Sequence, residues 1–175
     1  MINGLAGLPM KRLLLIVLLC AAPCPALALD SVAFEGGRGT GRTSLLRASL
    51  QWRGHEKWFE HSTWHIEHYM DLAVGGWNNG HHTVYDLGVT PVFRFQRASG
   101  SYFEAAIGFH AISELQFENN RETSTRFQFG DHLGAGVVRG RYDFGVRLQH
   151  LSNAGIRNPN PGINFIIFRV QYLLD

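Results

Sequence analysis

Apolar and polar residues alternate along most of the chain, in runs of about ten residues that end at turn-forming residues. Alternation with a period of two is typical of a β-strand with two different faces. No run keeps a helical period long enough to compete with it. The pattern predicts about eight strands, near residues 33–39, 43–52, 62–77, 83–95, 102–112, 126–138, 142–152 and 163–174.

Strand length and face chemistry favour a membrane barrel over a soluble β-sandwich, which is the alternative. Strands that cross a membrane need about 9–11 residues, more than the usual globular strand. One face of the runs is apolar, while the other is polar and interleaved with glycines, as in the narrow, filled lumen of a small barrel. The polar set is Glu67, Asp71, Glu104, Asp143, Arg147, Gln149, Arg169 and Gln171. The sequence thus predicts an all-β fold, an eight-stranded antiparallel transmembrane β-barrel.

Aromatic residues near the strand ends are candidates for the girdles that a membrane barrel places at the two interfaces. The predicted girdle residues are Trp58, Trp64, Trp77, Tyr102, Tyr142 and Tyr172.

The N-terminus has the pattern of a secretory signal rather than of a strand. Lys11 and Arg12 precede an apolar run that is too short for a membrane helix, and a small-x-small site follows at 26–28. We expect residues 1–28 to be a cleaved signal and 29–175 to be the mature domain; a membrane-anchoring N-terminal helix is the alternative. Cleavage would remove both cysteines and leave no net formal charge, which argues against a nucleic-acid partner.

The chemistry of the chain concentrates at the end of the run 142–152. His150 and Ser152 share the face of Phe144, Val146 and Leu148, because residues two apart in a strand point the same way. Unpaired polar groups on a lipid-facing surface cost free energy. We therefore interpret the pair as a serine nucleophile and its imidazole base, turned toward a membrane-borne ester. An interfacial histidine beside a turn-capping serine is the competing interpretation.

The residues that follow strengthen the catalytic interpretation. The stretch 152–164 is rich in asparagine, glycine and proline, which shape a fixed turn and offer backbone N–H groups for an oxyanion. The string HLSNAGI with PNPG after it resembles the signature of the outer-membrane lipid A 3-O-deacylases, the PagL family. The resemblance implies that His150 is the base, Ser152 the nucleophile, and Asn153 and Asn160 supporting residues, with Asn153, Ala154 and Gly155 around the oxyanion.

One position departs from that family pattern. The acid that orients the histidine in the family falls at Asn164 in this chain. An amide oxygen can hold the imidazole in place but cannot stabilise imidazolium with a charge. We expect either a slower triad or an acid recruited from elsewhere. No metal or cofactor is implied, because the other histidines, including His81 and His82, form no recognisable ligand motif.

These features predict an outer-membrane ester hydrolase that removes the 3-O-linked acyl chain of lipid A, the membrane part of lipopolysaccharide. A non-catalytic structural or adhesion barrel and another outer-membrane lipid enzyme, such as a phospholipase or acyltransferase, stay open. A homodimer is also open.

Overall fold

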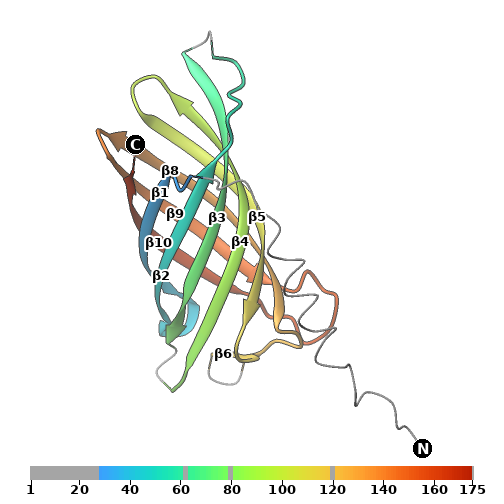
Figure 1. The fold of residues 1–175 in the computed structure, drawn as a ribbon. Coiled ribbons are helices and arrows are strands. Elements are labelled where there is room, and N and C mark those ends of the chain that lie inside the picture. The colour runs from blue at the N-terminus through green and yellow to red at the C-terminus, as the bar shows by residue number, and fades with distance from the viewer. Residues whose placement is uncertain (1–27, 61–62, 79–80, 119–120, 175) are drawn as a thin grey trace, which may run out of the picture.

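A computed structural model describes residues 28–60, 63–78, 81–118 and 121–174. Eight antiparallel strands close into one barrel in the order β1-β10-β9-β8-β5-β4-β3-β2 (Figure 1). Closure pairs β1 with β10, so that the sheet has no free edge. The predicted barrel is confirmed, and the sandwich alternative is wrong.

The strands coincide with the predicted runs and differ from them mainly at their ends. Their bounds are β1 Ser31–Gly39, β2 Ser44–Arg53, β3 Trp64–Asn78, β4 Thr83–Arg97, β5 Ser101–Ile112, β8 Phe127–Arg139, β9 Tyr142–Ser152 and β10 Ile163–Leu173. A single 3-10 turn, η1 Thr40–Arg42, links β1 to β2. Two short strands, β6 Gln116–Glu118 and β7 Arg121–Glu122, form a separate hairpin between β5 and β8.

The two faces of the strands are as different as the alternation predicts. All eight residues of the predicted polar set are buried, and they fill the lumen with ion pairs and hydrogen bonds. Arg147 is central: its guanidinium contacts Glu35 at 2.7 Å, Glu104 at 2.7 Å and Asp71 at 3.2 Å. Gly134 leaves room for Glu104, whose Cγ would lie 2.8 Å from an added Cβ. Charged side chains pack tightly enough there to fill the barrel.

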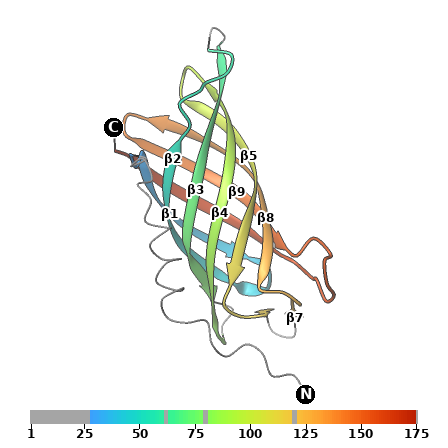
Figure 2. The same ribbon diagram turned by 45° about the vertical axis from the view of Figure 1, so that its right-hand side comes forward.

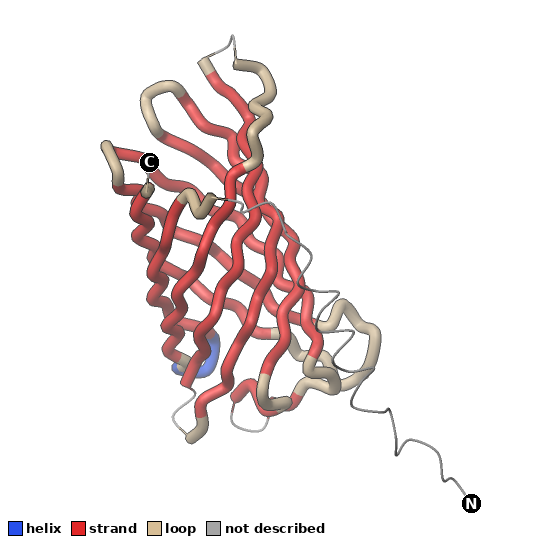
Figure 3. The backbone as a smooth tube through the Cα atoms, in the orientation of Figure 1, coloured by secondary structure: helices blue, strands red, loops and turns tan. Residues whose placement is uncertain are grey.

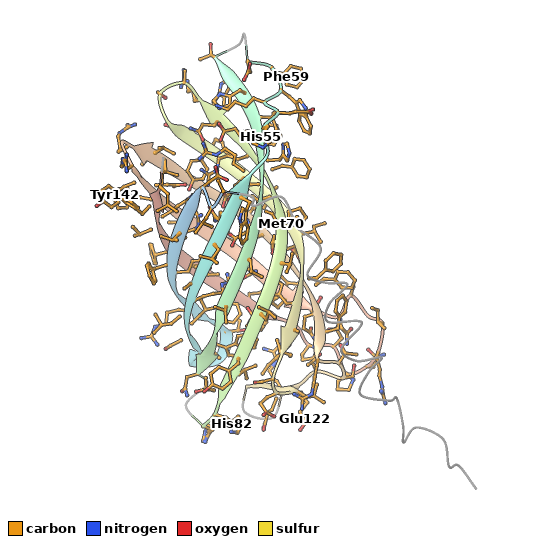
Figure 4. The ribbon with its side chains drawn as sticks, viewed as in Figure 1. His55, Phe59, Met70, His82, Glu122 and Tyr142 are labelled. Atoms are coloured by element: carbon orange, nitrogen blue, oxygen red, sulfur yellow. The ribbon has the colours of Figure 1, made fainter. Side chains whose placement is uncertain are left out.

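The outer face is apolar. Phe34, Leu46, Ile107, Leu133 and Phe168 are all more than 60 % exposed. Figure 4 shows side chains projecting outward around the barrel, with Tyr142 extending well clear of it. Among the described residues, no helix is long and apolar enough to cross a membrane.

Two of the predicted girdle residues point into the lumen, and the prediction that they face the membrane interface is wrong. Trp77 and Tyr102 are 1 % and 2 % exposed and lie inside the lumen. Both share the strand parity of lumen residues, since Trp77 is six positions from Asp71 and Tyr102 two from Glu104. Trp77 packs against Phe117 and Phe165, while Tyr102 donates to Asp143 Oδ1 at 2.6 Å. The other four lie at least partly on the outside.

The loops gather at two ends of the barrel. The chain from β9 to β10, residues 153–162, and the β6–β7 hairpin lie at the end opposite the C-terminus (Figures 1 and 2). Figure 3 shows the long strands between the two loop clusters. The predicted signal, residues 1–28, lies outside the described residues except for Ala28.

The lumen network should be sensitive to the loss of one charge. We predict that Arg147→Met lowers the free energy of unfolding by about 3–5 kcal/mol, because it leaves buried carboxylates without their partner. Denaturant unfolding in detergent micelles, followed by tryptophan fluorescence, measures the change. Arg126→Met is the control, since the side chain of Arg126 is exposed. Equal stability of the two variants would contradict a structural role for the network.

Candidate active site

Three outward-facing polar residues form a row across β8, β9 and β10. His150 in the middle strand pairs with Asp131 of β8 on one side and with Asn164 of β10 on the other. Directly opposed residues on antiparallel strands have Cβ atoms about 4.5–5.5 Å apart. The barrel therefore brings together three side chains that are widely separated in sequence, on the apolar outer face.

The central contact of the site joins His150 to Asn164. Their Nδ1 and Oδ1 atoms lie 2.7 Å apart. An amide oxygen only accepts hydrogen bonds, so this contact places the proton on Nδ1 and leaves Nε2 as the basic nitrogen. Asn164 is exposed on the outer face and contacts the imidazole there. The hydrogen bond between the two side chains is not assisted by a negative charge, because the Asn164 amide is neutral.

Ser152 lies two residues beyond His150 on the same strand and is half-buried. Its Oγ accepts a hydrogen bond from the Ala154 N–H at 3.3 Å. Within the described part of the chain, Ser152 and His150 share no hydrogen bond. Catalytic hydrogen bonds are often long or misaligned in a free enzyme and tighten when substrate binds.

Asn153 holds the loop that follows the serine. Its side chain is fully buried, donates to Arg157 O at 2.8 Å and to Ser124 Oγ at 3.0 Å, and accepts from the Gly155 N–H at 3.0 Å. Asn160 accepts from the Asn153 N–H at 2.9 Å. The two asparagines that the resemblance names as supporting residues thus bond to the backbone of the loop and fix its shape.

The backbone N–H groups beside Ser152 differ in the acceptors that they already have. The N–H groups of Asn153 and Gly155 already bond to side-chain oxygens, whereas the Ala154 N–H faces the serine oxygen. Ala154 also has a φ of 53°, which is uncommon for a residue with a side chain. Such strain persists only where the surrounding structure enforces it. Of the three predicted oxyanion residues, Ala154 is the one whose N–H points at Ser152 Oγ.

A cavity of about 590 Å³ opens beside the row. Its polar lining includes His150, Asn164 and Asp131, together with Arg38 of β1. Its apolar lining includes Leu133, Leu148 and Ile166. A mostly apolar cavity with a few convergent polar groups suits an acyl chain that carries a polar ester.

The sequence interpretation missed Asp131. Among the described residues of the eight barrel strands, it is the only carboxylate on the outer face. Its parity could have revealed it, since Asp131 stands between Phe129 and Leu133 on the apolar side of its strand. An ionised group at such a position is costly unless it has a function or a partner.

The other histidines that the structure describes stand apart from the row. His65 contacts Glu67, His82 contacts Gln116, and His110 contacts Asp86 inside the lumen. In the part of the chain that the structure describes, no three His, Cys, Asp or Glu side chains form a group that could hold a metal ion.

The sequence of this chain is similar to those of known proteins. Residues 44–173 match the family model described as lipid A 3-O-deacylase (PagL). A lipid A deacylase PagL of Pseudomonas aeruginosa is 32% identical over 164 residues, which cover 88% of this chain and 94% of that protein. A lipid A deacylase PagL of Bordetella bronchiseptica is 38% identical over 101 residues, covering 57% of this chain and about half, 55%, of that protein.

Solved structures agree with the sequence matches. The crystal structure of the outer membrane enzyme PagL superposes with a TM-score of 0.77 at 27% identity, over 81% of this chain and 98% of that one. A de novo designed transmembrane β-barrel matches with a TM-score of 0.55 at 12% identity, over 83% of this chain and 95% of that one, which supports the fold alone. The family model covers most of the chain, and the chain therefore belongs to the lipid A 3-O-deacylase (PagL) family.

Proposed function

We propose that the chain is an outer-membrane ester hydrolase that removes the 3-O-linked acyl chain of lipid A and so remodels lipopolysaccharide. Family membership supports the reaction and the membrane. The observation that carries the mechanism is the His150–Asn164 contact on the outer face, with Ser152 two residues further along the strand. There a lipid ester can reach the serine without leaving the membrane.

The reaction runs through an acyl-enzyme. Ser152 Oγ attacks the ester carbonyl while its proton passes to His150 Nε2. The bond between the carbonyl carbon and the sugar oxygen then breaks, and the imidazolium returns the proton to that oxygen. Water, deprotonated by the same imidazole, then attacks the acyl-serine. The bond between the carbonyl carbon and Ser152 Oγ breaks, the imidazolium returns the proton to Oγ, and the fatty acid leaves. Asn164 keeps the imidazole ring oriented throughout by accepting a hydrogen bond from Nδ1.

The Ala154 N–H serves as the main oxyanion donor. It already lies against Ser152 Oγ, next to which the negative oxygen of the tetrahedral intermediate forms. For the Asn153 and Gly155 N–H groups to take part, each would have to exchange a side-chain acceptor for the oxyanion. The asparagines thus act mainly by holding the loop in shape.

Asp131 supplies the negative charge that Asn164 lacks. It flanks His150 on the side opposite Asn164 and shares the same cavity. At an effective dielectric constant of about 20, two unit charges about 5 Å apart interact by roughly 3 kcal/mol. This energy would stabilise imidazolium as it forms. His150, Ser152, Asn164 and Asp131 all come from one chain, so the homodimer left open by the sequence is not needed for the reaction.

Removal of either member of the dyad should abolish hydrolysis but leave the barrel intact. We expect Ser152→Ala and His150→Ala each to lower turnover by about 1000-fold or more, because the acyl-enzyme can no longer form. Mass spectrometry of lipid A from cells that express each variant measures the acyl loss. Heat-dependent migration on gels checks the fold.

The same spectra separate the alternative functions. A structural barrel would leave lipid A unchanged in the wild type, a phospholipase would release products from phospholipid, and an acyltransferase would increase the mass of lipid A. Normal acyl loss in Ser152→Ala would refute the mechanism.

Asn164 should contribute orientation and little charge. We expect Asn164→Ala to lower kcat about tenfold, the equivalent of one neutral hydrogen bond. Asn164→Glu should raise kcat above that of the wild type, because a charge-assisted bond is roughly twice as strong. Kinetics on purified protein in micelles containing lipid A provide the comparison. If the alanine variant keeps full turnover, Asn164 does not orient the base.

The charge assigned to Asp131 can be tested by moving it. Asp131→Asn should lower kcat by about 10- to 100-fold, since it removes the charge and keeps the shape. The double variant Asp131→Asn with Asn164→Glu should recover most of that loss, because a carboxylate again lies beside the imidazole. A loss that the second change does not recover would mean that Asp131 acts on the substrate instead.

A further inference from the structure

A second edge of the His150 imidazole occupies the space where a side chain at position 162 would stand. A Cβ built on Gly162 would lie 2.5 Å from His150 Cε1 and 3.0 Å from Nε2. Gly162 is buried, has a φ of +61°, and directly precedes β10. The ring thus stands between the Asn164 amide at Nδ1 and the bare α-carbon of Gly162 at the edge that carries Nε2.

Gly162 is itself held by a residue from another loop. Arg121, at the start of β7, donates through Nη2 to the carbonyl oxygens of Pro161 at 3.1 Å and Gly162 at 3.2 Å. The last residues before β10 are therefore fixed by a guanidinium from the chain between β5 and β8. Figure 4 shows Glu122, the next residue, at the end of the barrel where this loop lies.

Ser124 makes a second set of contacts between the same two loops. Its backbone N–H donates to Pro159 O at 3.0 Å, and its Oγ donates to Arg157 O at 2.6 Å. The same Oγ accepts from Asn153 Nδ2 at 3.0 Å. The β5–β8 loop thus braces the loop 153–162 at its middle through Ser124 and at its end through Arg121.

We propose that Gly162 and Arg121 are positioning residues for the base. Gly162 provides the space that lets the imidazole stand with Nδ1 on Asn164 and Nε2 free for the serine proton, and Arg121 holds Gly162 at that distance. The inference rests on the proposed role of His150. Any side chain at position 162 would push the imidazole from its place. Loss of the Arg121 guanidinium would let the backbone at Gly162 shift relative to the imidazole.

The decisive variant is Gly162→Ala. Because misplacement of a catalytic group by about 1 Å can cost about 100-fold in rate, we expect kcat to fall by about that factor while KM stays within about twofold. Labelling of Ser152 by a fluorophosphonate should slow in parallel, since it requires the same proton transfer but none of the contacts to lipid A. In that reaction the serine oxygen binds phosphorus and fluoride leaves.

Gly140 offers a matched control for backbone strain. Its φ is +59°, nearly that of Gly162, and an added Cβ would meet no atom within 4 Å. It lies in the turn between β8 and β9, away from the active site. Gly140→Ala therefore carries the same left-handed strain and should keep wild-type turnover and labelling. Folded fraction is measured for both variants by heat-dependent gel migration.

Arg121 provides a second arm without backbone strain. Arg121→Met should lower kcat and the labelling rate about tenfold, and Arg121→Lys should recover part of the loss because an ammonium can still donate to a carbonyl. This arm decides the question if Gly162→Ala fails to fold. Wild-type kcat and labelling in folded Gly162→Ala, or in Arg121→Met if the former does not fold, would overturn the inference. Ser152→Ala distinguishes failure of this inference from failure of the proposed mechanism. Only an active Ser152→Ala variant would show that the mechanism itself is wrong.

Discussion

Closure of the sheet is the constraint on which the rest of the molecule depends. In hydrocarbon every backbone N–H and C=O must pair within the protein, and a ring of eight strands achieves this because β1 pairs with β10. Once the ring is closed, strict alternation sends each side chain either to lipid or to the lumen. A polar residue at an outward-facing position of a strand must therefore lie on the lipid-facing surface. For this reason the row of Asp131, His150 and Asn164 differs clearly from its apolar surroundings.

The lumen and the active site use charge in opposite ways. Inside, Arg147 and its carboxylate partners neutralise one another over short contacts and make a rigid, filled core. Outside, polar groups are few, and the site relies on a neutral amide for its shortest contact. The filled lumen supports the three strands of the site. Arg147 of β9 donates to Glu104, Asp143 of β9 contacts Arg169 of β10, and His132 of β8 lies 3.7 Å from the Glu104 carboxylate. Strands held in this way keep the spacing of the outward row.

Strand parity explains both the successes and the failures of prediction from sequence. It correctly placed His150 and Asn164 on one outer face and Arg147 in the lumen. The same parity applied to Trp77 and Tyr102 would have placed them inside, where aromatic character alone suggested a girdle. The contacts between the loops could not be predicted from the sequence. Nothing in the pattern around Asn153 indicates that its partner is Ser124, or that Arg121 would hold Gly162, because such contacts depend on how two loops meet in space.

Asn164 stands where the family resemblance implies an acid, and in the proposed mechanism this divides two tasks that a triad acid performs together. Orientation needs a short, directional acceptor at Nδ1, which the amide provides at 2.7 Å. Charge stabilisation needs only proximity, and in the proposed mechanism Asp131 provides it from the neighbouring strand. A neutral orienting group holds the ring less strongly than a carboxylate, so more of the positioning must come from packing. The space left by Gly162 beside the imidazole, where an added Cβ would lie 2.5 Å from Cε1, fits the positioning role proposed for this residue.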